Sequence, residues 1–600
     1  MSLFKKKDPT APEAPADEIK VDGSAAFGEF ETVSAAEVDE VMKKYDRESN
    51  TRIWTGVPKR VIQFIMALFS LYCIYSTLWS NASLEVRLMI FLGCVTIMGF
   101  LYYPMSKHHA RENYIPWFDW IIMIVGAACF FYYAFNFDAI IKVLTSASKM
   151  TPTLTVIGII GILSLVELCR RCVGIPILCV AGALLVYTFW SMLSKGMDLE
   201  RVLGRVIYTL FYGTGGVIGP PINVCAKFIV VFIVFGAFLE RTGIAKFFID
   251  LANKAAGASS GGPAKVAVIS SALCGMVSGS SVGNTVTTGS VTIPMMKKTG
   301  YKPEFAGAVE AAASTGGQIM PPIMGAAAFL MAEYMGVTYG QVTLWAILPA
   351  VLYFGGIFIS VHLEAKKLGL KGIPRSELPR FKYLIRNVYL LLPLVFLIWM
   401  VTANIRSLQF SAAIAILISI AVSLVGTIRD ASAEVKETKT GSVAGITAKK
   451  TGRMILDSLE AGGKGSITVA VACAMAALVI SGDVRRFFAE GYGMEADGFM
   501  LYAFLLTAGA IALWILFELI AVLCTVESDP FLERNARAFV RMGVAAEIAA
   551  ALFVGKCVFS FTAMTAVCAL VMALSGLFAL TLAAVFARAV AFKQENDLTI

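Results

Sequence analysis

The chain has 600 residues, of which 58% are hydrophobic and only 16% are charged, and its formal net charge is +9. A soluble domain carries roughly 25% charged residues, so this composition excludes an ordinary soluble protein and indicates one that crosses a membrane many times. Its basic residues collect in loops between apolar runs, as the positive-inside rule requires, and are not interleaved with aromatic residues, so a nucleic-acid partner is not expected.

Residues 1–58 form a polar segment that begins MSLFKKKDPTAPEAPADE. The basic residues are not followed by the apolar stretch of a secretory signal. We therefore expect a tail on the cytoplasmic side of the membrane.

Five apolar runs follow, at residues 61–80, 86–103, 117–137, 153–166 and 173–193. Most are long enough to cross about 30 Å of hydrocarbon as a helix. The run 153–166 is short, and we expect it to lie at the interface or to join its neighbour. The basic loops beside His108 and His109 and at Arg170 are expected to face the cytoplasm. The two histidines are interpreted as interfacial anchors, with a pH sensor as the alternative.

The next block, about residues 202–370, interrupts its apolar runs with irregular segments. The glycine- and proline-rich YGTGGVIGPPINV opens it at residues 212–224, and VSGSSVGNTVTTGS (277–290) and STGGQIMPPIMG (314–325) follow. Irregular backbone at membrane depth lines a cavity or is buried in protein. Broken helices of this kind mark the binding sites of secondary transporters. We therefore predict two hairpin-like interruptions between residues 270 and 325.

The segment 277–290 concentrates hydroxyl and amide oxygens beside glycines. Sodium is a hard cation that prefers oxygen ligands, and such ligands are offered by Ser280, Ser281, Asn284, Thr287 and Thr288. The alternative is that the small residues only allow close helix packing. A second interruption about 30 residues later, in which two adjacent prolines leave backbone acceptors unpaired, favours a binding site.

Three stretches carry a resemblance to a known family: GPAKVAVISSALCGMVSGSSVGNTVTTGSVTIPMMKKTGY, EFAGAVEAAASTGGQIMPPIMGAAAFLMAEYMG and VHLEAKKLGL. They resemble the large membrane subunit of tripartite ATP-independent periplasmic (TRAP) transporters, and most of all the fused permeases that work with TAXI-type binding proteins. The resemblance covers about residues 210–374, and residues 59–194 are similar to a fused small subunit. It implies secondary uptake of an organic acid across the bacterial inner membrane, through an elevator movement, with a periplasmic binding protein that delivers the acid.

The same resemblance implies roles for individual residues. The first sodium site would use Ser280 and Asn284 together with the carbonyl oxygens of Gly317, Met320 and Pro321. The carboxylates of the substrate would be bound near four further residues, which are Ser281, Thr287, Thr288 and Gln318.

Glu310 lies at apolar depth in EFAGAVEAAAS. An acidic residue inside a membrane is a functional candidate by default, so Glu310 is a possible coupling acid that carries a proton. The alternative is a glutamate near a helix start that faces water or pairs with Lys302. Sodium and proton coupling therefore both stay open.

The last part of the chain departs from the TRAP pattern. Residues 456–474 (LDSLEAGGKGSITVAVACA) still resemble the opening of a second inverted repeat. An inverted-repeat transporter needs a matching second broken hairpin, and residues 475–600 contain a single proline, Pro530. Residues 485–600 instead resemble a small bacterial membrane family of unknown function, through the DPF-x-x-x-N-A turn and the END-L-T-I ending. A natural fusion and faulty sequence assembly are both possible origins of this join.

The sequence thus predicts an all-α polytopic membrane protein with about 14 transmembrane helices and an incomplete inverted repeat. Its expected parts are a cytoplasmic tail (1–58), small-subunit-like helices (59–194), a TRAP large-subunit-like region (195–475) and an unrelated membrane module (476–600).

The expected function is that of a TRAP permease component in the bacterial inner membrane. Its expected partners are the lipid bilayer, a TAXI-type binding protein and an organic acid, and no cofactor is expected apart from a coupling sodium ion. The alternative is a truncated or chimeric protein that docks a partner or regulates without transporting. An enzyme is not expected, because the 12 cysteines are scattered, the chain has three histidines, and no nucleophile elbow is present.

Overall fold

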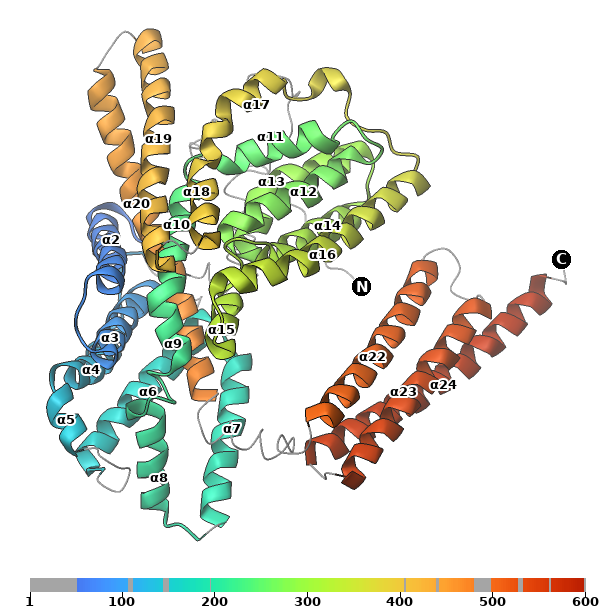
Figure 1. The fold of residues 1–600 in the computed structure, drawn as a ribbon, viewed down its shortest axis with the longest axis horizontal. Coiled ribbons are helices and arrows are strands. Elements are labelled where there is room, and N and C mark those ends of the chain that lie inside the picture. Colours follow the sequence, from blue (N-terminus) through green and yellow to red (C-terminus); the bar gives the residue numbers. More distant parts are fainter. Residues whose placement is uncertain are drawn as a thin grey trace, which may run out of the picture. The chain divides into compact units, whose positions relative to one another are not determined.

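The computed structural model describes residues 51–105, 112–143, 150–194, 196–403, 406–438, 442–479, 498–526, 533–559 and 563–597. In these ranges every regular element is a helix (Figure 1), and 11 helices are long and apolar enough to cross a membrane. The expectations for His108 and His109, for most of the tail and for the join after residue 479 lie outside the described residues. The all-α polytopic fold is confirmed, with 11 such helices where the sequence suggested about 14 spans.

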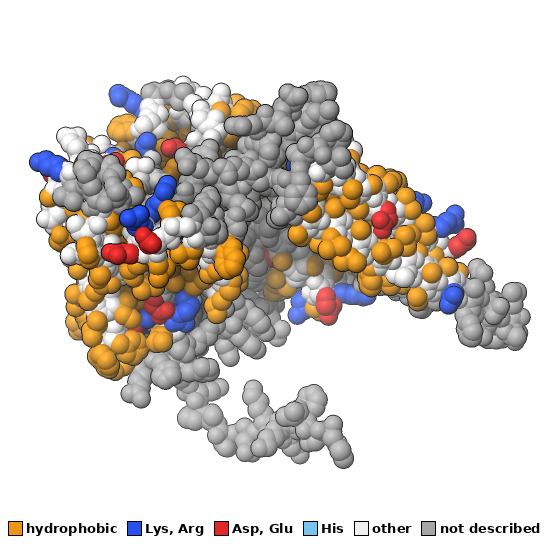
Figure 2. All heavy atoms as spheres, turned by 90° about the horizontal axis from the view of Figure 1, so that it is seen from below, with side chains coloured by type: hydrophobic (Ala, Val, Ile, Leu, Met, Phe, Trp, Pro, Cys, Tyr) orange, Lys and Arg blue, Asp and Glu red, His pale blue; other side chains and the backbone are white. Residues whose placement is uncertain are grey.

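The chain divides into two compact units, residues 1–481 and 482–600. The first unit begins with α2 (Gly56–Leu78), α3 (Leu84–Tyr102), α4 (Trp117–Phe135), α5 (Phe137–Val143), α6 (Pro152–Cys172) and α7 (Ile175–Ser194). Both units carry many exposed large hydrophobic side chains, and Figure 2 shows few charged groups among the hydrophobic ones on the described surface. Such a surface fits a hydrocarbon surrounding.

Helix α6 corrects one expectation from the sequence. The run 153–166 is neither interfacial nor merged with its neighbour, because it belongs to a 21-residue helix that is apolar enough to span a membrane. The charged residues Glu167, Arg170 and Arg171 follow residue 166, so the sequence alone suggested that the apolar run ended there. In the structure Arg171 pairs with Glu167 of the same helix and with the buried Asp119 of α4, so these charges are neutralised locally.

The centre of the first unit is built on α20 (Val443–Val479), which packs against α2 and α10 (Val230–Glu240). Gly462 and Gly463 allow the close approach, because a Cβ atom added at either would lie less than 3 Å from atoms of the facing helix. Ser70 of α2 donates a hydrogen bond to the carbonyl oxygen of Leu459 at 2.7 Å. This hydrogen bond joins α2 to α20 across a separation of 389 residues in the sequence.

Three shorter elements lead into α10: α8 (Leu199–Ile207), a π turn (Tyr208–Tyr212) and α9 (Pro220–Val224). Two prolines occupy the first turn of α9, where their missing N–H groups need no helical partner. A π turn, Cys225–Ile229, then joins α9 to α10, so that residues 220–240 form one continuous candidate span.

The predicted interruptions are both present. Helices α12 (Gly262–Ser278) and α13 (Ser281–Thr299) form a hairpin, and α14 (Pro303–Gly316) is separated from α15 (Ala326–Met335) by an irregular stretch at 317–325. Together with α16 (Tyr339–Lys367), the helices α12, α13 and α14 enclose an apolar core separate from that around α20, whereas the buried residues of α15 belong to the latter. Figure 1 shows α12, α13, α14 and α16 side by side.

The remaining helices of the first unit are α11 (Ile244–Ala256), α17 (Phe381–Asn387), α18 (Leu392–Thr402) and α19 (Leu408–Thr438). Many basic residues lie in α11, which connects α10 to α12, or at and beside the ends of α13 and α16. Among them are Lys246, Lys254, Lys297, Lys298, Lys302, Lys366, Lys367, Lys371, Arg375 and Arg380. At the opposite end, the described connections 79–83, 213–219 and 336–338 contain no Lys or Arg, and Arg406 lies between α18 and α19. By the positive-inside rule the basic end faces the cytoplasm.

The second unit contains three described helices, α22 (Gly498–Val526), α23 (Glu533–Phe559) and α24 (Ala563–Asp597). Helices α23 and α24 pack along much of their length. Arg541 of α23 pairs with Glu518 of α22 at 2.8 Å. An ion pair of this kind lets two charged side chains lie among apolar helices.

Candidate functional site

The tip of the hairpin is formed by Gly279 and Ser280. Gly279 has φ +59°, a conformation that suits glycine, and it ends α12. Ser280 begins α13 as its N-cap, because its hydroxyl oxygen accepts a hydrogen bond from the N–H of Gly283 at 3.2 Å. A Cβ atom at Gly279 would lie 2.5 Å from the carbonyl oxygen of Met324, so the tip abuts the irregular stretch of the broken helix.

The hairpin and the broken helix also meet at two glycines. A Cβ atom at Gly275 would lie 2.3 Å from the Cα atom of Gly317, so the backbones of α12 and of the irregular stretch are in contact. Gly317 begins a short 3-10 turn, and its carbonyl oxygen accepts from the N–H of Met320 at 3.2 Å. Only residues without a side chain permit this approach.

Asn284 lies beside this contact and is only 1% exposed. Its Nδ2 atom donates to the carbonyl oxygen of Ser271 at 2.8 Å. A main-chain carbonyl only accepts, so the amide NH2 group faces Ser271 and Oδ1 faces elsewhere. Oδ1 is buried and has no hydrogen-bond partner in the described part of the chain. An unsatisfied buried oxygen is costly, and a hard cation would satisfy it.

The predicted ion ligands are therefore only partly assembled by the structure. Asn284 and Gly317 come together, since the Nδ2 atom of Asn284 lies 3.1 Å from the position of a Cβ atom on Gly317. Ser280 lies at the adjoining tip. Met320 and Pro321 continue the irregular stretch, and the hydrogen bonds of the described residues do not link them to Asn284.

Two predicted substrate residues pair across the hairpin and the break. The Nε2 atom of Gln318 donates to Ser281 Oγ at 3.1 Å, and both residues are partly or fully exposed. The hydroxyl of Thr287 donates to the carbonyl oxygen of Gly283 at 2.8 Å. Thr288 lies elsewhere, fully buried on the face of α13 that meets Glu310.

Glu310 is fully buried and is surrounded by hydroxyl groups from three helices. Its Oε1 atom accepts from Ser271 and from Ser314, each at 2.9 Å, and from Thr288. Its Oε2 atom accepts from Thr292. The alternative of a glutamate that faces water or pairs with Lys302 is wrong, because these donors from α12, α13 and α14 enclose the carboxylate.

The two clusters are connected through one residue. Ser271 donates its hydroxyl to Glu310 and offers its main-chain oxygen to Asn284. The carboxylate thus helps to hold the residue that orients the unpaired Asn284 oxygen. Sequence reasoning had no signal for this link, because the three residues belong to three helices.

A hollow of about 250 Å³ opens beside Asn284 and Thr287, and Glu240 and Cys274 also line it. Sequence reasoning did not connect Glu240 with the hairpin. The glycine pair Gly275 and Gly317 was likewise not singled out. A small residue facing a second small residue is visible only once the helices are packed.

Comparison with known proteins adds an independent finding. Residues 160–485 match the family described as "Tripartite ATP-independent periplasmic transporter, DctM component". The chain is 29% identical over 150 residues to the C4-dicarboxylate TRAP transporter large permease protein DctM of Pseudomonas aeruginosa, which covers 24% of this chain and 34% of that protein. The Vibrio cholerae protein of the same name is 28% identical over 211 residues, covering 35% and 43%.

A third relative is the isethionate TRAP transporter permease protein DctMQ of Oleidesulfovibrio alaskensis, 28% identical over 146 residues, which covers 24% of this chain and 23% of that protein. The chain thus matches less than half of the length of each of these relatives.

Proposed function

Because the chain belongs to the family of the DctM component of tripartite ATP-independent periplasmic transporters, we propose that it is an ion-coupled permease that takes up an organic acid. The family and the many apolar helices make it a multi-pass protein of the inner membrane. The acid would be delivered by a periplasmic binding protein of the TAXI type. Residues 59–194 would act as a fused small subunit, since α2 packs directly on α20.

One observation carries the ion coupling. Asn284, whose side chain lies beside Gly317 of the broken helix, has a buried amide oxygen without a partner among the described residues. Amide and carbonyl oxygens suit sodium. We assign Asn284 and the carbonyl oxygen of Gly317 to the ion, with Ser280, Met320 and Pro321 as further ligands.

The substrate region of this proposal is the exposed side of the same contact. Ser281 and Gln318 are already within hydrogen-bond distance of each other there. Both side chains can donate hydrogen bonds to a carboxylate. Thr287 lies on α13, the helix that Ser281 begins, whereas Thr288 would support the site from behind by its bond with Glu310.

The coupling acid proposed from the sequence is Glu310. Its carboxylate is enclosed by hydroxyl donors from the hairpin and from α14, so gain of a proton would weaken the contact between these elements. A proton on Glu310 and a sodium ion at Asn284 would then act on the same hairpin through Ser271. Coupling to either ion is consistent with this arrangement.

The helices α12, α13, α14 and α16 have a core of their own. A bundle that packs internally is able to move as one body against a second bundle. This supports an elevator movement in which the hairpin and the broken helix carry the site past α10 and α20.

Uptake of labelled organic acids tests the proposal. The full chain would be reconstituted in liposomes with a TAXI-type binding protein from the same genome, and uptake would be measured with an inward sodium gradient, a pH gradient or neither. Sodium-dependent uptake that is lost in Asn284→Ala but kept in the control Ser290→Ala supports the proposed site. Uptake driven only by the pH gradient, and lost in Glu310→Gln, would assign the coupling to the proton.

The second candidate function is a membrane protein that docks the binding protein without transport. It is favoured by the second unit, whose described residues form three helices in the part of the sequence where a second broken hairpin is expected. Binding-protein affinity without uptake under any gradient would support this candidate and exclude the first.

A further inference from the structure

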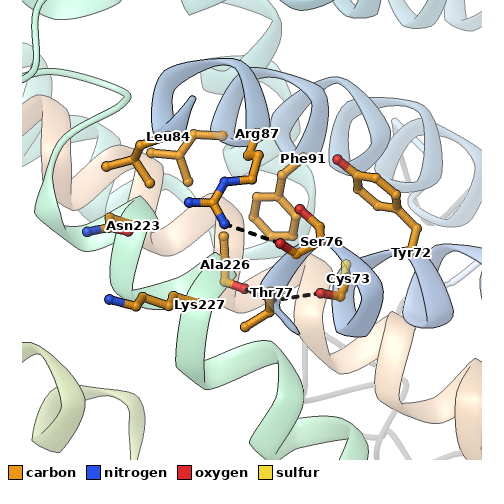
Figure 3. Close-up of a pocket in the computed structure, with 11 residues that line it drawn as sticks. Tyr72, Cys73, Ser76, Thr77, Leu84, Arg87, Phe91, Asn223, Ala226 and Lys227 are labelled. Carbon is orange, nitrogen blue, oxygen red and sulfur yellow. Dashed lines mark hydrogen bonds between the residues drawn. The ribbon is translucent and has the colours of Figure 1, made fainter. Parts of the chain in front are cut away.

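A second pocket lies far along the chain from the hairpin, between α2, α3 and the turn that joins α9 to α10. The space between these elements, counted together with the solvent open to it, is about 380 Å³. Figure 3 shows Arg87 reaching over it from α3, with Asn223 and Lys227 on the facing wall. The other lining residues are Tyr72, Cys73, Ser76, Thr77, Leu84, Leu88, Phe91 and Ala226.

The pocket is positively charged. It is lined by an arginine and a lysine and by no aspartate or glutamate. Arg87 donates from Nη1 to the carbonyl oxygen of Ser76 at 3.2 Å, while its buried Nε atom has no partner among the described residues. Lys227 is exposed and lies over the ring of Phe228, 5.1 Å from its centroid. Several N–H donors are therefore available for one oxyanion.

The position of the pocket indicates where that oxyanion comes from. The pocket adjoins the connection 79–83, at the end of the unit opposite to the basic segments, which is the periplasmic end by the positive-inside rule. Tyr75 and Trp79, which are 57% and 64% exposed, stack beside it with ring centroids 6.4 Å apart. Exposed aromatic side chains of this kind mark the headgroup level of a bilayer.

The surface below the aromatic pair is apolar. Phe64, Leu68 and Leu71 are all at least 50% exposed, and with Tyr75 they follow one another along α2 at helical spacing. A ligand with an oxyanion at headgroup level and hydrocarbon chains below it would fit both parts. A phospholipid has this chemistry.

We propose that Arg87, Asn223 and Lys227 bind the phosphate group of a phospholipid of the periplasmic leaflet, whose acyl chains lie along the exposed face of α2. The phosphate oxygens would accept hydrogen bonds from Arg87 Nε, which has no partner among the described residues, and from Lys227 Nζ. Such a lipid would join α2 and α3 to the residues that open α10. The proposal does not depend on which substrate or ion the protein transports.

Native mass spectrometry of the full chain in detergent tests the proposal, with phosphatidylglycerol as the lipid probe and sn-glycerol 3-phosphate as the free phosphate probe. Loss of one charge is expected to weaken phosphatidylglycerol binding by about fivefold in Arg87→Gln and in Lys227→Gln. Arg406→Gln, at the same end of the unit but outside this pocket, should bind as the natural chain does. Arg87→Lys should show a partial loss, because lysine keeps the charge without the Nε donor.

The two probes distinguish the sources of phosphate. Retention of phosphatidylglycerol together with no measurable binding of glycerol phosphate supports the lipid. Equal phosphatidylglycerol affinity in the natural chain and in Lys227→Gln, a surface change that leaves the core intact, would overturn the proposal. Binding of glycerol phosphate without lipid retention would also overturn it.

Discussion

The side-chain NH2 group of Asn284 donates to the main-chain oxygen of Ser271 at 2.8 Å. This bond fixes the orientation of the amide, and its oxygen is buried without a partner among the described residues. In the proposed sodium site this oxygen would be held in place before an ion arrives, which would reduce the cost of ordering it on binding.

The first prediction concerns this oxygen. Sodium at about ten times its Kd should stabilise the natural chain by about 1.4 kcal/mol relative to a large cation such as choline. Asn284→Ala should abolish the increase in unfolding temperature that sodium causes in the natural chain, measured by intrinsic fluorescence in detergent. Ser290→Ala on the same helix is the control. An undiminished sodium effect in Asn284→Ala would show that the ion binds elsewhere.

The second prediction concerns the glycine contact. Gly275→Ala should push α12 away from Gly317 and destabilise the protein by about 1–3 kcal/mol, the usual cost of overpacking. Gly355→Ala in α16 is the matched control, because nothing lies within 4 Å of its added Cβ atom, and alanine is the better helix former. If both variants unfold at the same temperature, the hairpin is not held against the break as described.

The third prediction concerns Glu310. Glutamine in its place would bring an NH2 donor into a cluster of hydroxyl donors, at an expected cost of about 1–3 kcal/mol. The unfolding temperature of Glu310→Gln should therefore fall, while that of Glu333→Gln, an exposed glutamate at the end of α15, should not. Equal unfolding temperatures for Glu310→Gln and the natural chain would contradict the hydrogen bonds described for this carboxylate.

The fourth prediction concerns the ion cluster at the cytoplasmic end. Asp119 is fully buried and pairs with both Arg52 and Arg171. Asp119→Asn should destabilise the protein by about 3–5 kcal/mol, because the buried Arg52 loses its counter-charge and Arg171 keeps only Glu167. Asp198→Asn breaks an exposed pair with Arg201 and should have no measurable effect. Chemical denaturation of the two variants in detergent gives the comparison.

The fifth prediction concerns pH. Burial raises the pKa of Asp250 from 3.8 to about 6, and the charge of Lys246 opposes this only in part. The folded protein therefore keeps a proton that the unfolded chain has lost, so stability falls as the pH rises through this interval. Asp250→Asn should raise the unfolding temperature at about pH 7.5 and much less at about pH 4.5.

The control for the pH prediction is Asp430→Asn, which changes an exposed aspartate on α19. It should leave the pH dependence unchanged. A pH profile of Asp250→Asn that runs parallel to that of the natural chain would contradict the assignment.

The sequence by itself determined the class of the protein and the place of its interruptions. Apolar runs long enough to span a bilayer predict helices, since in hydrocarbon every backbone N–H and C=O group must be paired within the chain. Glycines and prolines at residues 279 and 317–325 end helices through their own backbone geometry. These are local effects, so the hairpin and the broken helix were predictable from the amino-acid sequence alone.

Tertiary structure alone decided which side chains meet. The contact of Gly275 with Gly317, the burial of the Asn284 oxygen and the hydroxyl groups around Glu310 all join residues of different helices. The length of α6 also depended on packing, because the charges that seemed to end it are neutralised by Asp119 of α4. Helical periodicity states which face of a helix is apolar or polar, whereas the partner of that face is set by how the helices pack.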